Sequence, residues 1–187
     1  MSLPNIITIA RMLAVPLIVW LIISGQLMIA FLVFIAAGLS DAVDGFIAKR
    51  FHLATTLGAY LDPLADKLLL VSIYISLGYL DILPVWLVIL VTSRDFMIVG
   101  GLLLAWFMER PMAIQPLFVS KANTTGQIIL AGIALGLPGF GFESFHLIIW
   151  GSVAVGILTV ASGAFYLRDW IRHMANGNGQ PPAKEKQ

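Results

Sequence analysis

Long apolar runs, separated by short polar or glycine- and proline-containing breaks, dominate the sequence. The breaks fall at Ser24–Gly25, Lys49–Thr56, Asp81–Pro84, Glu109–Pro116 and Gly136–Ser144. Several runs approach or exceed the roughly 20 residues with which a helix crosses a bilayer. The pattern predicts helices over about residues 4–24, 27–50, 58–80, 83–108, 121–138 and 144–173. We therefore expect an all-α membrane bundle of six transmembrane helices.

The composition agrees with a membrane protein. Charged residues make up 11% of the chain and the mean hydropathy is +0.95, whereas soluble domains carry roughly 25% charged residues. We expect one membrane domain over residues 1–175 and a disordered polar tail over 176–187, which is rich in glycine, proline and polar residues. The first apolar run lacks a basic leader and a small-residue cleavage site, so it is interpreted as a retained span. A net charge of +1 gives no support to nucleic-acid binding, and the absence of cysteine excludes thiol chemistry.

Basic residues are distributed unevenly between the expected loops. The N-terminal side, the loops near Lys49 and Lys121, the C-terminal tail and the helix halves next to these segments hold nearly every Lys and Arg, while the loops around Gly25, Asp81 and Phe140 hold none. The positive-inside rule then predicts that both termini face the cytoplasm. This orientation fits a bacterial inner membrane, or a mitochondrial inner membrane with the same face toward the matrix.

Aspartates and small residues form a stripe on each of two consecutive helices. On the first helix, the spacing i, i+3, i+4, i+7 aligns Asp41, Asp44, Gly45 and Ala48. On the second helix, the spacing i, i+4, i+8 aligns Gly58, Asp62 and Asp66. A short loop joins the two helices, so we expect them to be antiparallel neighbours whose carboxylates converge below the cytoplasmic surface.

Converging carboxylates in a membrane need positive charge nearby, because each alone is costly to bury ionised. Lys67 and Arg94 can offset part of it, but four grouped carboxylates favour one or two divalent cations. Oxygen ligands without His or Cys indicate a hard ion such as Mg²⁺ or Mn²⁺, and the small residues leave room for a phosphate-bearing substrate. The alternatives from the residues alone are helix packing and a cation channel or transporter.

With their spacings, these residues resemble the signature of the CDP-alcohol phosphotransferase family, D-x2-D-G-x2-A-R-x8-G-x3-D-x3-D. Seven of the eight fixed positions match over 26 residues, running from Asp41 to Asp66. Lys49 stands where the family has arginine; lysine keeps the charge but loses bidentate phosphate geometry. A non-catalytic scaffold would follow only if this change disabled the site.

The resemblance implies a six-helix membrane enzyme, usually a homodimer, with a divalent-metal site open to the cytoplasm. It would transfer the phosphatidyl group of a CDP-linked lipid to an alcohol and release CMP. Asp41, Asp44 and Asp62 correspond to metal ligands, and Asp66 to a residue that borders the metal and acts as general base. Residues implied to receive the cytidine and pyrophosphate are Gly45, Ala48, Lys49 and Gly58.

Resemblances in other segments, which are less specific than the aspartate motif, bear on the identity of the acceptor alcohol. The segment "LPNIITIARMLAVP", with polar positions Asn5, Thr8 and Arg11, resembles the branch that includes phosphatidylglycerophosphate synthases and eukaryotic-type cardiolipin synthases. Asn5 and Thr8 are expected to bind the CDP-lipid. "TSRDFMIVGG" and "SKANTTGQ" resemble the cardiolipin synthase version of these helices. The residues expected to bind the acceptor are Arg11, Arg94, Lys121, Asn123 and Thr124.

The supply of cations bears on the same choice. Glycerol 3-phosphate carries about two charges and favours a dedicated Lys and Arg cluster. Phosphatidylglycerol carries one phosphodiester charge and two acyl chains. Arg94 is followed directly by Asp95, which can neutralise it. The modest basic content favours CDP-diacylglycerol and phosphatidylglycerol as substrates, with cardiolipin as product; glycerol 3-phosphate remains the alternative acceptor.

Overall fold

The chain forms an all-helical bundle. The computed structural model describes the backbone of residues 3–51, 56–107 and 118–175 and the side chains of residues 12–40, 66–100 and 118–171. Within these ranges there are six helices and no strand. The helices are α1 (Leu3–Ile23), α2 (Leu27–Phe51), α3 (Thr56–Tyr79), α4 (Val85–Phe107), α5 (Phe118–Gly139) and α6 (Phe145–Ala175).

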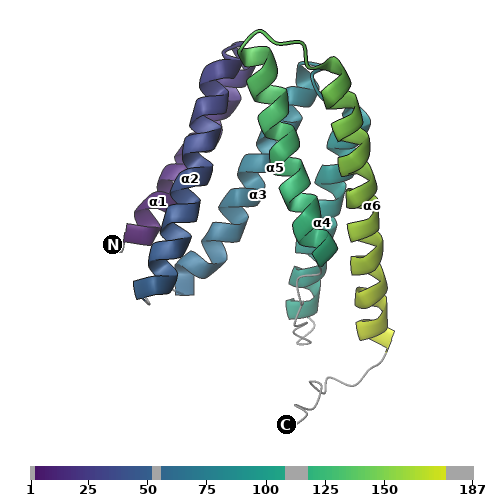
Figure 1. Cartoon of the computed structure of the whole chain (residues 1–187). Helices are drawn as coiled ribbons and strands as arrows, with labels where there is room; N and C mark the ends of the chain where they lie inside the picture. Colours follow the sequence, from purple (N-terminus) through teal and green to yellow (C-terminus); the bar gives the residue numbers. More distant parts are fainter. Residues whose placement is uncertain (1–2, 52–55, 108–117, 176–187) are drawn as a thin grey trace.

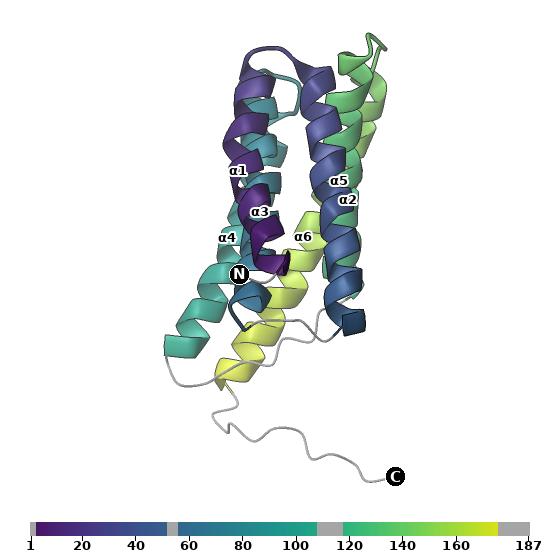
Figure 2. The ribbon, with the colours of Figure 1, turned by 90° about the vertical axis from the view of Figure 1, so that its left-hand side faces the viewer.

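Consecutive helices run in opposite directions, with the turns α1–α2, α3–α4 and α5–α6 at one end of the bundle and both termini at the other (Figure 1). The view turned by 90° separates α1 and α3 from α2 and α5 (Figure 2). Helix α1 packs against α2 and α3, α5 against α2, α3 and α6, and α4 against α3 and α6. The site-bearing helix α3 therefore has neighbours on several sides.

The turns opposite the termini are short because their residues adopt left-handed backbone conformations. Gly25 and Gly141 have φ values of 73° and 79°, which glycine adopts without steric cost. Asp81 has a φ of 56°, in a region where Asp is more often found than most residues. These turns lie where the sequence predicted breaks, so the end of each preceding helix is confirmed to within a few residues.

Apolar packing is concentrated toward that same end. Fully buried side chains there include Ile22, Tyr74, Leu77, Leu83 and Leu135. Toward the termini the buried residues become polar, as α4, α5 and α6 bury Arg94, Asp95, Asn123, Gln127, Thr159 and Ser162. The bundle therefore has a firmly packed apolar half and a half whose interior carries hydrogen-bonding groups.

The outer surface is apolar, and large hydrophobic side chains are exposed on all six helices. Leu13, Trp20 and Trp150 are 68%, 59% and 71% exposed. Surfaces of this kind exceed what soluble monomers tolerate. Among the residues whose side chains are described, Phe145–Ile171 is long and apolar enough to cross a membrane, and Met12–Ile23 and Leu27–Ser40 are shorter apolar helices.

Candidate active site at Asp66

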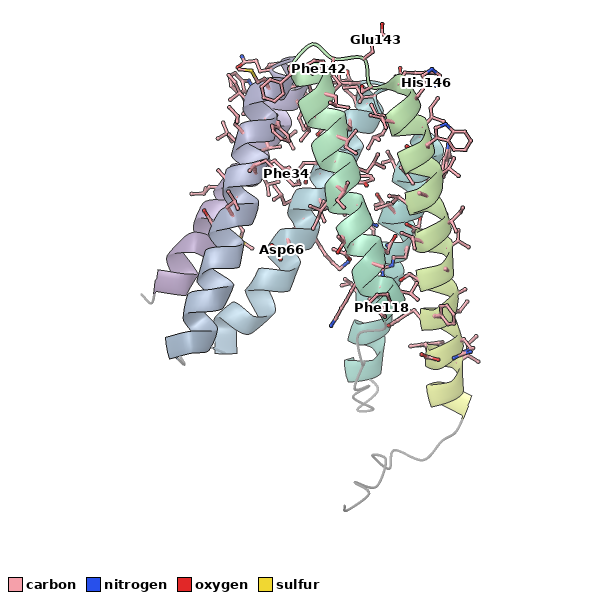
Figure 3. All side chains as sticks on the ribbon, in the orientation of Figure 1. Phe34, Asp66, Phe118, Phe142, Glu143 and His146 are labelled. Atoms are coloured by element: carbon pink, nitrogen blue, oxygen red, sulfur yellow. The ribbon has the colours of Figure 1, made fainter. Side chains whose placement is uncertain are left out.

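Asp66 lies on the wall of a cavity of about 360 Å³ between α2, α3 and α5. Most of the lining is apolar; besides Asp66 and Thr124 it consists of Phe34, Ile35, Ala37, Gly38, Leu39, Leu69, Leu70 and Ile128. In Figure 3, Asp66 lies closer than Phe34 to the end of the bundle that carries the termini. The last aspartate of the motif is thus half-buried and faces a space large enough for part of a lipid substrate.

The expectation that α2 and α3 are direct neighbours needs correction for the described part of the chain. There, α2 packs on α1 and α5, and α3 packs on α1, α4 and α5, without contact between α2 and α3. The cavity lies between them instead. Helices α1 and α5 each pack against both α2 and α3, and so connect the two helices that carry the motif.

Arg94 and Asp95 form a buried pair on α4. Arg94 Nη1 lies 2.6 Å from Asp95 Oδ1, and Lys67 Nζ of α3 lies 2.8 Å from the same oxygen. Arg94 Nη2 donates to Ser120 Oγ of α5 at 2.7 Å and to Ser162 Oγ of α6 at 2.6 Å. The expectation that Asp95 neutralises Arg94 is confirmed, and the network joins four helices.

The expected acceptor residues of α5 occupy different surroundings. Thr124 lines the cavity together with Asp66, and its hydroxyl donates to the Ser120 carbonyl at 3.2 Å. Lys121 is exposed. Asn123 is fully buried, and its Oδ1 accepts a hydrogen bond from the Thr159 hydroxyl of α6 at 2.9 Å. The structure therefore brings Thr124, but not the side chain of Asn123, to the cavity wall.

The remaining predicted site residues have side chains outside the described residues. They are Asn5, Thr8, Arg11, Asp41, Asp44, Gly45, Ala48, Lys49, Gly58 and Asp62. Their backbone positions fall within α1, α2 and α3. The polar tail over 176–187 also lies outside the described part, so its predicted disorder stays a prediction.

Two residues that organise the site were not anticipated from the sequence. Ser120 and Ser162 each accept a hydrogen bond from Arg94. A signal for Ser162 existed in the otherwise apolar α6, because Ser152, Thr159 and Ser162 are spaced to share one face of the helix. Small polar residues at such spacing commonly hydrogen-bond to neighbouring helices in membranes.

The described part of the site is compatible with a divalent metal but supplies only a fraction of its ligands. Asp66 and Thr124 present oxygen donors to the cavity, and no His or Cys is among its described lining residues. That donor chemistry suits Mg²⁺ or Mn²⁺. Within the described side chains, no group of three His, Cys, Asp or Glu residues could hold a metal.

A comparison with protein-family models decides the family. The model described as CDP-alcohol phosphatidyltransferase matches residues 1–158. The chain belongs to this family. The family predicted from the aspartate motif is thereby confirmed.

Individual relatives of the chain carry two kinds of name. A human cardiolipin synthase (CMP-forming) is 35% identical over 182 residues, covering 88% of this chain and 60% of the human protein. A Bacillus subtilis CDP-diacylglycerol–glycerol-3-phosphate 3-phosphatidyltransferase is 34% identical over 190 residues, covering 90% of this chain and 95% of the relative. A chloroplastic rice protein of the same kind is 36% identical, with 89% of this chain and 56% of its own length covered. The chain thus spans less than two thirds of the human and rice relatives.

Proposed function

We propose that this family member is an integral membrane enzyme that transfers the phosphatidyl group of CDP-diacylglycerol to phosphatidylglycerol, yielding cardiolipin and CMP. The observation that carries the proposal is the cavity at Asp66, in which one motif carboxylate meets largely apolar walls. An acceptor with acyl chains can bury them against such walls. The similarity to cardiolipin synthases supports the same acceptor.

Asp66 would act as the general base. Its carboxylate takes the proton of the acceptor hydroxyl as that oxygen bonds to the phosphatidyl phosphorus, and the bond from this phosphorus to the bridging pyrophosphate oxygen breaks. CMP leaves with the electron pair of that bond. Deprotonation matters because a neutral hydroxyl is a poor nucleophile.

Asp41, Asp44, Asp62 and Asp66 would hold Mg²⁺ or Mn²⁺. When bound, such an ion offsets the charge on the pyrophosphate and on the departing phosphate. Gly45, Ala48 and Gly58 would leave space for the cytidine and pyrophosphate, with Lys49 providing positive charge. Asn5 and Thr8 would contact the CDP-lipid, and Arg11, Lys121 and Thr124 the acceptor.

A second candidate is a phosphatidylglycerophosphate synthase with glycerol 3-phosphate as acceptor. The alignment with the Bacillus subtilis relative favours it, because it covers nearly the whole of that protein. The arrangement of cations favours the lipid acceptor, because Lys67 and Arg94 both form ion pairs with Asp95, which offsets part of their positive charge.

The deciding experiment is an assay of the purified protein in mixed micelles with CDP-diacylglycerol. Phosphatidylglycerol and glycerol 3-phosphate are supplied separately, with Mg²⁺, Mn²⁺ or a chelator, and CMP and lipid products are quantified. We expect metal-dependent CMP and cardiolipin with phosphatidylglycerol. Product only with glycerol 3-phosphate would establish the second candidate, and no CMP with either acceptor would contradict both. A channel or transporter would release no CMP.

A further inference from the structure

A tyrosine hydroxyl joins the two helices that carry the polar residues of the cavity wall. Tyr74 of α3 donates a hydrogen bond to the backbone carbonyl of Gln127 on α5 at 3.1 Å. Both residues are fully buried, so the bond is shielded from lipid and water. A buried hydroxyl that lost its acceptor would retain the cost of its desolvation. The bond therefore favours one defined contact between α3 and α5.

The acceptor of this bond belongs to the main chain of α5. A backbone carbonyl has two lone pairs, so that of Gln127 can accept from Tyr74 in addition to its bond within the helix. A backbone acceptor moves only with its helix, whereas a side-chain acceptor can change rotamer. The Tyr74 ring is itself packed in the apolar core. The bond consequently fixes α5 as a whole against the core.

The bond connects the two cavity walls without forming part of either surface. On α3, Asp66 lines the cavity and lies about two turns before Tyr74. On α5, Thr124 lines the same cavity and lies less than one turn before Gln127. Tyr74 is not among the described lining residues. A substrate in the cavity would therefore feel this hydroxyl only through the placement of the helices.

The position of Asp66 is sensitive to the contact at Tyr74. Helices α3 and α5 pack against each other and diverge toward the end that carries the termini (Figure 1). Asp66 lies eight positions from Tyr74, which is about 12 Å at a rise of about 1.5 Å per residue. A change of about 5° in the direction of α3 would move Asp66 by about 1 Å, and a misplacement of that size can cost about 10²-fold in rate.

We propose that Tyr74 is a positioning residue for the transfer reaction. Its hydroxyl fixes α5 against α3 and so aligns an acceptor held at Thr124 of α5 with the carboxylate of Asp66 on α3. A general base must come within hydrogen-bond reach of the proton that it removes, so the alignment of these two helices decides how often that geometry is reached. The inference rests on the proposed function, since it takes the cavity as the acceptor site and Asp66 as the base.

The first test is Tyr74→Phe, which removes the hydroxyl and keeps the ring that fills the core. We expect kcat/KM for phosphatidylglycerol to fall about tenfold, with its KM raised about threefold or more, because the acceptor is no longer held in one alignment. KM for CDP-diacylglycerol should stay within about twofold, since the residues proposed to bind it lie on α1, α2 and the first turn of α3. A lower kcat with both KM values unchanged would indicate only a loss of folded protein and would overturn the proposal.

Tyr166→Phe is the matched control. The Tyr166 hydroxyl of α6 donates to the backbone carbonyl of Ile98 on α4 at 3.2 Å. This variant loses the same kind of bond, between two helices that contribute none of the described lining residues, so both KM values should stay within about twofold. Replacement of Tyr74 by 4-aminophenylalanine keeps a donor on the ring and should restore KM for phosphatidylglycerol. Equal effects of Tyr74→Phe and Tyr166→Phe, or no rescue by the amine, would overturn the proposal.

A distance measurement tests the contact without relying on activity. Spin labels are attached at Ile75→Cys on α3 and Ile129→Cys on α5, in a chain without natural cysteine. Both side chains are exposed on the outer surface, so the labels do not enter the core. The labelled pair should give one narrow distance distribution, which Tyr74→Phe broadens or shifts and Tyr166→Phe leaves unchanged. A broad distribution with Tyr74 intact would overturn the proposal, and this test holds even if Tyr74→Phe does not fold.

The outcomes distinguish this proposal from the proposed function. An unchanged KM for phosphatidylglycerol in Tyr74→Phe, in a protein that makes cardiolipin, overturns only the role of Tyr74. Absence of CMP release from the unaltered protein with either acceptor overturns the proposed function and, with it, the positioning role. Activity with glycerol 3-phosphate alone overturns the assigned acceptor, and KM for glycerol 3-phosphate in Tyr74→Phe then decides the role of Tyr74.

Discussion

At the scale of single residues, the site is defined by which polar groups face the cavity and which are held inside the bundle. Asp66 and Thr124 face it. Arg94, Asp95 and Asn123 are buried and bonded to side chains of other helices. Position in the bundle therefore separates polar residues that line the cavity from polar residues that connect the helices.

Asp66→Asn should lower the rate of CMP release by a factor of about 10² to 10⁴, because the amide cannot take the acceptor proton. The measurement is turnover with saturating CDP-diacylglycerol. Asp81→Asn is the matched control, since Asp81 is exposed in the turn at the opposite end and asparagine tolerates its φ of 56°. Retention of full activity by Asp66→Asn would remove it from the mechanism.

Arg94→Met should lower the stability of the bundle by about 2 kcal/mol or more, because Asp95 loses one buried partner and the two serines lose their donor. The thermal midpoint in detergent is the readout. Arg168→Met is the control, because its pair with Asp169 at 3.4 Å is exposed and such pairs contribute about 0–1 kcal/mol. Equal shifts in the two variants would show that the buried network does not stabilise the fold.

At the scale of helices, the sequence predicted where elements lie better than which elements touch. The helix expected over 83–108 is found at Val85–Phe107, and the helix expected over 121–138 at Phe118–Gly139. Breaks at glycine, proline and polar clusters mark helix ends locally, so they are readable without a structure. The start of α5 was placed late because Ser120 and Lys121 were interpreted as the edge of a loop.

Contacts between helices were harder to predict, because the spacing of residues along one helix does not identify its partner. Asn123 shows the difficulty: its position near the start of a helix did not indicate that its side chain would accept a hydrogen bond from Thr159 of α6. The aspartate motif, in contrast, identified the family because its spacing is fixed along two consecutive helices of the sequence.

Gly139→Ala should destabilise the contact between α5 and α2. A Cβ at Gly139 would lie 2.6 Å from the backbone nitrogen of Met28, which no side-chain rotation can relieve. We expect a loss of about 1–3 kcal/mol, read as a lower thermal midpoint. Gly132→Ala on the same helix is the control, since its nearest neighbour, Phe31, would be at 4.0 Å. An unchanged midpoint in Gly139→Ala would mean that the two helices separate without cost.

At the scale of the whole molecule, the two ends of the bundle differ in chemistry. The end with the turns carries the apolar core, and Phe142, Glu143 and His146 lie there in Figure 3. The other half holds the cavity and the ion pairs that Asp95 forms with Lys67 and Arg94. The distribution of Lys and Arg in the sequence predicts that this second end faces the cytoplasm.

Single cysteines can test this orientation cleanly, because the natural chain has none. In intact bacterial spheroplasts that express the protein, a membrane-impermeant maleimide should label Phe142→Cys and leave Ala183→Cys unlabelled. After the membrane is permeabilised, both should react. The reverse pattern would contradict the predicted orientation. Labelling of both positions in intact spheroplasts would contradict the prediction that the two positions lie on opposite sides of the membrane.

The separation of α2 from α3 has a consequence for how the width of the site is determined. In the described part of the bundle, the two helices that carry the motif do not contact each other, and α1 and α5, which contribute none of its aspartates, each pack against both. The width of the cavity therefore depends in part on residues outside the aspartate motif. Exchange of bulky for small side chains along the face of α5 that lines the cavity offers a way to change its width while the motif aspartates are left untouched.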